Sequence, residues 1–168
     1  MKHLNLLMIF ILSLYSVLGN ADSLALVSEE MRFLNLINQY RQHHNLPTLS
    51  LSPQLEASSA WMSKDMATQD YVEHTDSQRR GPFTRMAQFG YTFQTHKGEN
   101  ILAGVKFDTA EAAFEGWRTA CDEDENGKCT YAHNENMLDH HFHVIGISRS
   151  YGELAEYNWF WVTDFGGK

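Results

Sequence analysis

Histidine is the residue type in this chain that most readily suggests chemistry, with nine among 168 residues. A neutral imidazole binds metal ions such as zinc, and it exchanges protons near neutral pH. His74 follows a predicted helix, His133 follows a short loop between two cysteines, and Glu99 adds a carboxylate between Gly98 and an apolar run. From spacing alone these three residues are only candidates for a site. The simpler interpretation, that turns satisfy their hydrogen bonds, is the stronger one at this point.

The other histidines have weaker contexts. His43 and His44 end a predicted helix, where a positive charge interacts favourably with the helix dipole. His140, His141 and His143 lie in a run that leads into a predicted strand. Because neighbouring strand residues point to opposite faces, this run is not predicted to share one metal ion.

The segment between the two cysteines resembles the first half of a calcium-binding loop. Asp122, Asp124, Asn126 and Gly127 follow the pattern D-x-D-x-N-G, in which alternating oxygen ligands precede a sharp turn. The twelfth position, which should carry a bidentate glutamate, is His133. The pattern therefore predicts at most a weak calcium site, and an acidic solvated turn is the favoured alternative.

The first 21 residues have the pattern of a secretory signal peptide. A short basic start precedes an almost continuous apolar run over residues 4–18, and Gly19-Asn20-Ala21 supplies small residues before a cut. We expect cleavage after Ala21 or Gly19, because the apolar run is short for a membrane anchor. The protein is therefore predicted to be secreted or periplasmic. In that oxidising environment the pair Cys121 and Cys129 is expected to form a disulfide that closes one local loop.

Composition limits the partners and the domain organisation. The formal net charge is −8, with 21 acidic against 13 basic residues, which argues against nucleic acid or an anionic membrane as the main partner. No helix pairs a basic face with an apolar face, so stable membrane insertion is not expected. Residues 22–168 are enough for a single domain, and no linker divides them.

The pattern of elements predicts an α+β fold of packed layers. Ser52 and Pro53 indicate the start of a helix, and Asp108 with Glu111 suggests a capping box at the start of another. The predicted helices cover 28–43, 53–70, about 82–90 and from 108 onward. The predicted strands cover 98–102, 144–149 and 158–165, and the last two are expected to form an antiparallel hairpin.

An ordered set of short motifs resembles the CAP superfamily of cysteine-rich secretory, antigen 5 and pathogenesis-related proteins. The closest resemblance is to its bacterial secreted, SCP-like branch. The resemblance covers residues 30–166, nearly the whole mature chain. In chain order the motifs are Asn38 and Arg41, Met66-Ala67, Tyr71 to His74, Pro82-Phe83-Thr84-Arg85, Gly90-Tyr91, Gly98-Glu99-Asn100-Ile101, Trp117, His133 with Asn136-Met137-Leu138, Phe142, Gly146, and Val162-Thr163-Asp164-Phe165-Gly166.

The resemblance implies an α-β-α sandwich with a central antiparallel sheet and a cleft. In many relatives two histidines and two glutamates line that cleft, and the histidines can bind a divalent metal such as zinc. Carried over to this chain, the matching residues are His74, Glu99 and His133. The second glutamate falls at Ala120 here, and Asp122 is close enough in sequence to replace it.

Three functions remain open on the sequence. The favoured one is a non-enzymatic extracellular binding module whose cleft takes a divalent metal, and whose ligand is a lipid, a sterol or a protein. The second is a metal-dependent hydrolase in which His74, Glu99 and His133 would be catalytic. The third is a structural or defence-related scaffold with a vestigial cleft. Enzyme activity is not indicated, since the chain lacks His-Glu-x-x-His and Gly-x-Ser-x-Gly motifs.

Overall fold

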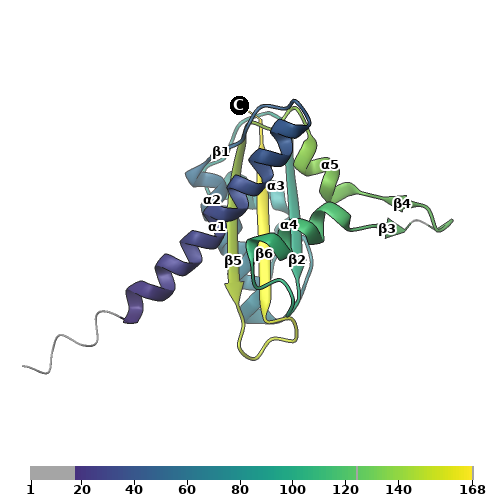
Figure 1. Ribbon diagram of the computed structural model, residues 1–168. Helices are drawn as coiled ribbons and strands as arrows, with labels where there is room; N and C mark the ends of the chain where they lie inside the picture. The colour runs from purple at the N-terminus through teal and green to yellow at the C-terminus, as the bar shows by residue number, and fades with distance from the viewer. Residues whose placement is uncertain (1–17, 124, 168) are drawn as a thin grey trace, which may run out of the picture.

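The computed structural model describes residues 18–123 and 125–167 of the chain (Figure 1). Its helices and strands alternate without a regular βαβ pattern. In chain order they are α1 (Leu18–His43), β1 (Ser50–Leu51), α2 (Pro53–Gln69), α3 (Pro82–Gln88), β2 (Lys97–Ala103), α4 (Ala110–Thr119), β3 (Asp122–Glu123), β4 (Cys129–Thr130), α5 (Ala132–Leu138), β5 (Val144–Tyr151) and β6 (Trp159–Gly166).

The long strands form the central sheet in the order β1-β5-β6-β2. β6 pairs antiparallel with both β5 and β2, so that Ile147 and Ile101 lie opposite Thr163 and Val162 respectively. This confirms the predicted hairpin and the predicted strand at 98–102. The two-residue strand β1 adds a parallel edge to β5, which makes the sheet mixed.

The two faces of the sheet are covered by different helices, which gives the α-β-α layers expected from the sequence. In Figure 1, α1 and α4 cross in front of the strands. This front face is packed with residues of α1, α4 and α5 against alternate residues of β5 and β6. The opposite face is covered by α2 and α3. Its apolar residues are Leu55, Met62, Met66, Met86, Tyr91, Ile101, Val144, Ala155, Phe160 and Val162.

The close approach of α2 to the sheet depends on Gly146 in β5. A side-chain carbon at this position would overlap the backbone of Leu55 and the backbone nitrogen of Glu56 in α2. Backbone cannot move aside as a flexible side chain can, so only glycine permits this packing. Gly146 thereby allows α2 to pack closely against the β6 residues that include Asp164.

The helix termini largely follow the sequence signals. Ser52 is the N-cap of α2, where its hydroxyl accepts a hydrogen bond from the backbone N–H of Leu55 at 3.5 Å. The predicted start of the fourth helix at Asp108 was wrong by one residue. Thr109 is the N-cap, because its hydroxyl is the group that reaches the N–H of Ala112, at 3.3 Å.

Four short elements were not predicted: β1, β3, β4 and α5. Helix α5 has only seven residues and begins with a polar stretch, so it lacks the apolar repeat that identifies longer helices. The segment between the cysteines forms a small antiparallel hairpin of β3 and β4, in which Asp122 lies opposite Thr130. This hairpin projects away from the body of the molecule (Figure 1).

Most of the predicted signal peptide, residues 1–17, lies outside the described part of the chain. Helix α1 begins at Leu18 and continues through residues 19–21, where cleavage is predicted. None of the helices in the described residues has the length and apolar character needed to span a bilayer.

Candidate metal-binding cleft

His74 and Glu99 form the centre of the candidate site. His74 lies in the loop after α2, and Glu99 lies in β2 on the face covered by α2 and α3. The Nδ1 atom of His74 is 2.8 Å from Oε1 of Glu99. The His74 side chain is 52% exposed, whereas that of Glu99 is 1% exposed. A buried carboxylate thus holds an imidazole ring that faces solvent.

Arg85 fixes the other side of the Glu99 carboxylate. Its guanidinium is fully buried on α3, donates a hydrogen bond to Oε2 of Glu99, and contacts the backbone carbonyl of His74 at 3.3 Å. With both oxygens engaged, Glu99 orients His74 rather than offering a free ligand atom. If Glu99 accepts the Nδ1 proton, Nε2 of His74 is left as the available lone pair. The motif at 82–85 had marked Arg85 in the sequence, but not its contact with Glu99.

A second carboxyl group lies beside Glu99 on the same face. Asp164 in β6 is the register partner of Glu99 and is completely buried. Burial and then the charge of Glu99 raise the pKa of Asp164 well above its usual value, and Ser58 and Arg85 offset only part of this increase. A neutral Asp164 is therefore favoured beside the Glu99 carboxyl group. The sequence signal was an acidic residue within an otherwise apolar and aromatic strand.

His133 approaches from the first turn of α5. Its position is fixed by Asn100, whose amide donates to the His133 carbonyl at 2.9 Å and accepts from the Asn136 amide at 2.8 Å. The Nδ1 atom of His133 is buried and has no hydrogen-bond partner within the described residues. Burial lowers the pKa of His133, Asp122 opposes this effect, and the nearby His74 adds to it. His133 is therefore favoured as a neutral imidazole with an unsatisfied nitrogen.

Asp122, the residue expected from the sequence as a possible replacement for the second glutamate, lies close to His133. Ala120 caps the end of α4, and Asp122 follows it in β3. Oδ2 of Asp122 lies 3.6 Å from Nδ1 of His133. The structure therefore places the Asp122 carboxylate beside His133.

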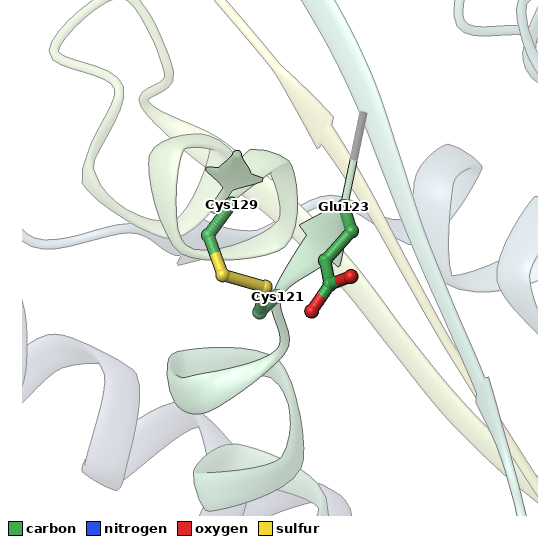
Figure 2. Close-up of side chains that lie close together, drawn as sticks. All are labelled: Cys121, Glu123 and Cys129. Carbon is green, nitrogen blue, oxygen red and sulfur yellow. A yellow bond between two sulfur atoms is a disulfide. The ribbon is translucent and has the colours of Figure 1, made fainter. Parts of the chain in front are cut away.

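The cysteine hairpin holds Asp122 in place. Cys121 and Cys129 form the predicted disulfide, with their Cα atoms 5.1 Å apart. Figure 2 shows the disulfide with Glu123 beside it. These three side chains lie close enough for a metal site, but bonded sulfurs are not the thiolate ligands that metals require. Of the predicted calcium ligands Asp122, Asp124 and Asn126, Asp124 lies outside the described residues, so the calcium site stays a prediction.

The residues of the candidate site are not gathered around one point. Across the described residues, two groups of three potential metal ligands have atoms within 4.8 Å of one another, and neither includes His74, Glu99 or His133. The donor set nevertheless suits zinc: two imidazole nitrogens and an exposed carboxylate, with an unsatisfied Nδ1 on His133. To bind one ion, the ligand atoms of His74, Asp122 and His133 would have to come closer together than they are here.

The chain is similar to known proteins over most of its length. The family model described as "CAP: Cysteine-rich secretory protein family" matches residues 34–165. A comparison with curated protein sequences finds no significant match. Among solved structures, an extracellular protein from Bacillus anthracis that contains an SCP domain is 26% identical with a TM-score of 0.67. The alignment covers 84% of this chain but 41% of that protein.

Two other solved structures share the fold at lower identity. An outer surface protein from Borrelia burgdorferi is 16% identical with a TM-score of 0.68, over 84% of this chain and 93% of the other. A cysteine-rich secretory protein from Staphylococcus aureus is 12% identical with a TM-score of 0.58, over 84% of this chain and 38% of the other. The chain thus spans about two fifths of two of these three proteins and nearly all of the third.

Proposed function

The chain belongs to the CAP family of cysteine-rich secretory proteins, and on that basis we propose that it is an extracellular binding module whose cleft takes a divalent metal ion. His74 and His133 would hold the ion, Asp122 would add a carboxylate oxygen, and Glu99 would orient His74. The observation that carries this proposal is the buried, unsatisfied Nδ1 of His133 opposite a carboxylate-oriented His74.

The arrangement of Glu99 supports the assignment of roles. A histidine that binds metal usually donates its other N–H to a carboxylate, which fixes the tautomer and the ring orientation. His74 has this partner in Glu99, and Arg85 holds Glu99 in turn. The earlier expectation that Glu99 is itself a ligand is therefore replaced in this proposal by an orienting role.

Binding is favoured over hydrolysis for a reason of geometry. A bound zinc ion would polarise a carbonyl group or lower the pKa of a bound water. A hydrolase of this kind also needs a base within hydrogen-bond reach of the attacking water. Glu99 is occupied on both oxygens, and the buried Asp164 is favoured in its neutral form. Neither carboxyl group is well placed to accept a proton, so the hydrolase remains the second alternative.

The lipid or sterol ligand expected from the resemblance stays a prediction. The described residues include an apolar hollow of about 430 Å³ beside β1, lined by Leu51, Pro53, Tyr91, Phe93 and Val144 among others. Its volume lies within the range of small-molecule sites. It lies apart from His74 and His133, so metal binding and any apolar ligand would be separate properties.

Zinc binding to the cleft can be tested by competition with a chromophoric chelator. The parent is compared with His74→Ala, His133→Ala and Asp122→Asn, and with His43→Ala as an exposed histidine outside the cleft. We expect the two cleft histidine variants to lose at least tenfold in affinity and His43→Ala to lose none. Glu99→Gln should lower affinity 10- to 100-fold if its role is to orient His74.

The same measurements can contradict the proposal. Equal zinc affinity in the parent, His74→Ala and His133→Ala would remove the cleft as a metal site. If only Glu99→Gln bound normally while both histidine variants lost zinc, the histidines would stay as ligands and the orienting role of Glu99 would be wrong. The fold of each variant is checked by its near-ultraviolet circular dichroism, which reports the buried tryptophans.

A further inference from the structure

A second group of metal-type side chains lies at the other end of α5. We define the histidine cluster as His96, His140, His141 and Asp139. His96 precedes β2, while the other three residues lie in the connection from α5 to β5. The ring of His141 stacks on that of His96 with centroids 3.9 Å apart, and it lies 3.7 Å from that of His140. Three imidazoles from two distant segments of the chain therefore meet on the surface.

The cluster contains a carboxylate that orients one of the rings. Oδ1 of Asp139 lies 2.8 Å from Nδ1 of His141 and accepts the backbone N–H of the same residue at 2.8 Å. Nδ1 of His140 lies 3.9 Å from the same oxygen. Asp139, His140 and His141 each offer a ligand atom within 4.8 Å of the others. Nε2 of His141 remains available, as in sites where a carboxylate fixes a metal-binding histidine.

The sequence argument against this run assumed strand geometry, and the structure corrects that assumption. β5 begins at Val144, and residues 140–141 form a turn before it. In a turn, consecutive side chains need not point to opposite faces. His143 is not part of the cluster, and its Nδ1 lies 3.0 Å from the His141 carbonyl oxygen. The third imidazole of the cluster comes from His96.

The backbone beneath the cluster is held rigidly. Arg41 is fully buried and donates hydrogen bonds to the carbonyls of Met137 and Asp139 at 2.9 and 3.0 Å, and to that of Phe142 at 3.1 Å. Both segments are also tied to the end of β6. Gly167 donates to the His96 carbonyl at 3.0 Å, and His143 donates to the Gly166 carbonyl at 2.8 Å. The ligand-bearing segments are therefore positioned before any ion binds, which reduces the entropy lost on binding.

The donor types of the cluster suit a divalent cation. His141 lies between the other two rings, with centroids 3.9 Å from His96 and 3.7 Å from His140, and its Nδ1 contacts the Asp139 carboxylate. The cluster thus combines one carboxylate with three imidazoles, a donor set that suits Zn²⁺, Cu²⁺ or Ni²⁺ better than Ca²⁺ or Mg²⁺.

We propose that the histidine cluster is a second, surface metal site that binds an imidazole-preferring divalent cation independently of the cleft. His133 lies in the first turn of α5 and Asp139 caps its end, so the two sites are separated by roughly 9 Å along the helix axis. The stacked rings must rotate to direct nitrogen atoms at one ion. The His140 and His141 side chains are 71% and 43% exposed, so this rotation meets little steric resistance.

The test is a titration of the full chain with Zn²⁺ and, separately, with Cu²⁺. It is made on the parent, on His133→Ala, and on His133→Ala combined with His140→Ala and His141→Ala. The matched control combines His133→Ala with His43→Ala and His44→Ala, which removes two neighbouring exposed histidines at the end of α1. We expect His133→Ala to keep one bound ion and the control to match it within twofold. The variant without His140 and His141 should lose at least tenfold in affinity for that ion.

A spectroscopic measurement identifies the ligands directly. The electron paramagnetic resonance spectrum of Cu²⁺ bound to His133→Ala should show nitrogen hyperfine structure that disappears without His140 and His141 and is reduced by His96→Ala. The proposal is overturned if removing His140 and His141 leaves affinity unchanged, or if the control loses as much. A failure of the cleft proposal would look different. In that case the parent and His133→Ala would bind the same number of metal ions.

Discussion

The strands of the central sheet bury carboxyl groups on the face covered by α2 and α3, and uncharged residues on the face covered by α1, α4 and α5. The face covered by α1, α4 and α5, the first face, packs aromatic and aliphatic residues such as Phe33, Trp117 and Trp161. The face covered by α2 and α3, the second face, includes, beside its own apolar residues, the buried Arg85, Glu99 and Asp164. Burying apolar side chains stabilises a fold. A buried ion pair seldom makes the fold more stable than apolar residues of similar size would.

This difference indicates that the two faces have different roles. The first face supplies the stability of the domain. The second face buries the Glu99 carboxylate, which lowers stability but holds this group in one orientation beneath His74. If this interpretation is correct, substitutions on the two faces should differ in size, in whether a second substitution can reverse them, and in their effect on zinc binding.

The largest loss of stability is expected on the apolar face, from Trp117→Ala. The Trp117 ring is fully buried, packs edge-on against Phe33 with centroids 5.3 Å apart, and donates its Nε1–H to the Ile101 carbonyl at 3.0 Å. Removing a buried aromatic ring leaves a cavity and costs about 3–5 kcal/mol in free energy of unfolding. Urea denaturation followed by circular dichroism measures this cost.

Leu154→Ala provides the control, because the Leu154 side chain is 97% exposed and its removal should change stability by less than about 0.5 kcal/mol. The zinc affinity of the folded Trp117→Ala protein should equal that of the parent. A loss of less than about 1 kcal/mol, or a selective loss of zinc binding, would contradict the division between the faces.

A smaller but reversible loss is expected on the polar face, from Arg85→Met. This change leaves Glu99 buried without its cation. Breaking a buried pair in this way costs about 3–5 kcal/mol, and we expect the low end here because Glu99 keeps its contact with His74. Adding Glu99→Gln removes the uncompensated charge, so the double variant should regain part of the lost stability. Denaturation of both single variants and the double variant, together with zinc competition, gives the complete cycle.

Both variants of this pair should bind zinc more weakly, since His74 loses its oriented carboxylate in each. Stability losses that simply add in the double variant would show that Arg85 and Glu99 do not act as a pair. No second substitution is expected to reverse Trp117→Ala in the same way, because a cavity is not a charge that can be removed.

The apolar face could largely be predicted from the sequence because its signals are local. Phe33 and Ile37 recur at helical spacing, and the 144–149 and 158–165 segments have the β-branched and aromatic composition of strands. Each of these patterns lies within one element. The structure confirmed the helices and strands that they predicted, with shifts at some boundaries.

The polar face could be predicted only in part, because its contacts join residues far apart in the chain. The motifs identified His74, Glu99 and His133, but the contacts of Glu99 with Arg85 and Asp164 depend on how α3 and β6 meet β2. The histidine cluster was missed for a related reason. His96 and His141 are 45 positions apart in the sequence, and only the folded end of β6 brings them together.

The smallest effect is expected where the polar face meets solvent, from Asp65→Asn on α2. The Asp65 carboxylate anchors the loop that carries His74: it accepts hydrogen bonds from the Tyr71 hydroxyl at 2.5 Å and from the Ser77 N–H and hydroxyl at 2.8 and 2.7 Å. Partial burial opposes ionisation, but the bonds from Tyr71 and Ser77 outweigh it and lower the pKa of Asp65. At pH 7 the substitution should cost about 1 kcal/mol, a small value because solvent reaches the group.

The sign of the pH dependence follows from that lowered pKa. An acid whose pKa is lower in the folded state stabilises the fold above its unfolded pKa, which is 3.8 for Asp65, and this contribution disappears as the pH falls through the folded value. The difference in unfolding free energy between parent and Asp65→Asn should therefore shrink below about pH 4. Urea denaturation at a series of pH values measures it, with Glu73→Gln in the same loop as the control. A difference that stays constant with pH would mean that Asp65 holds the loop through shape and not through its charge, and the polar face would then extend no further than Arg85, Glu99 and Asp164.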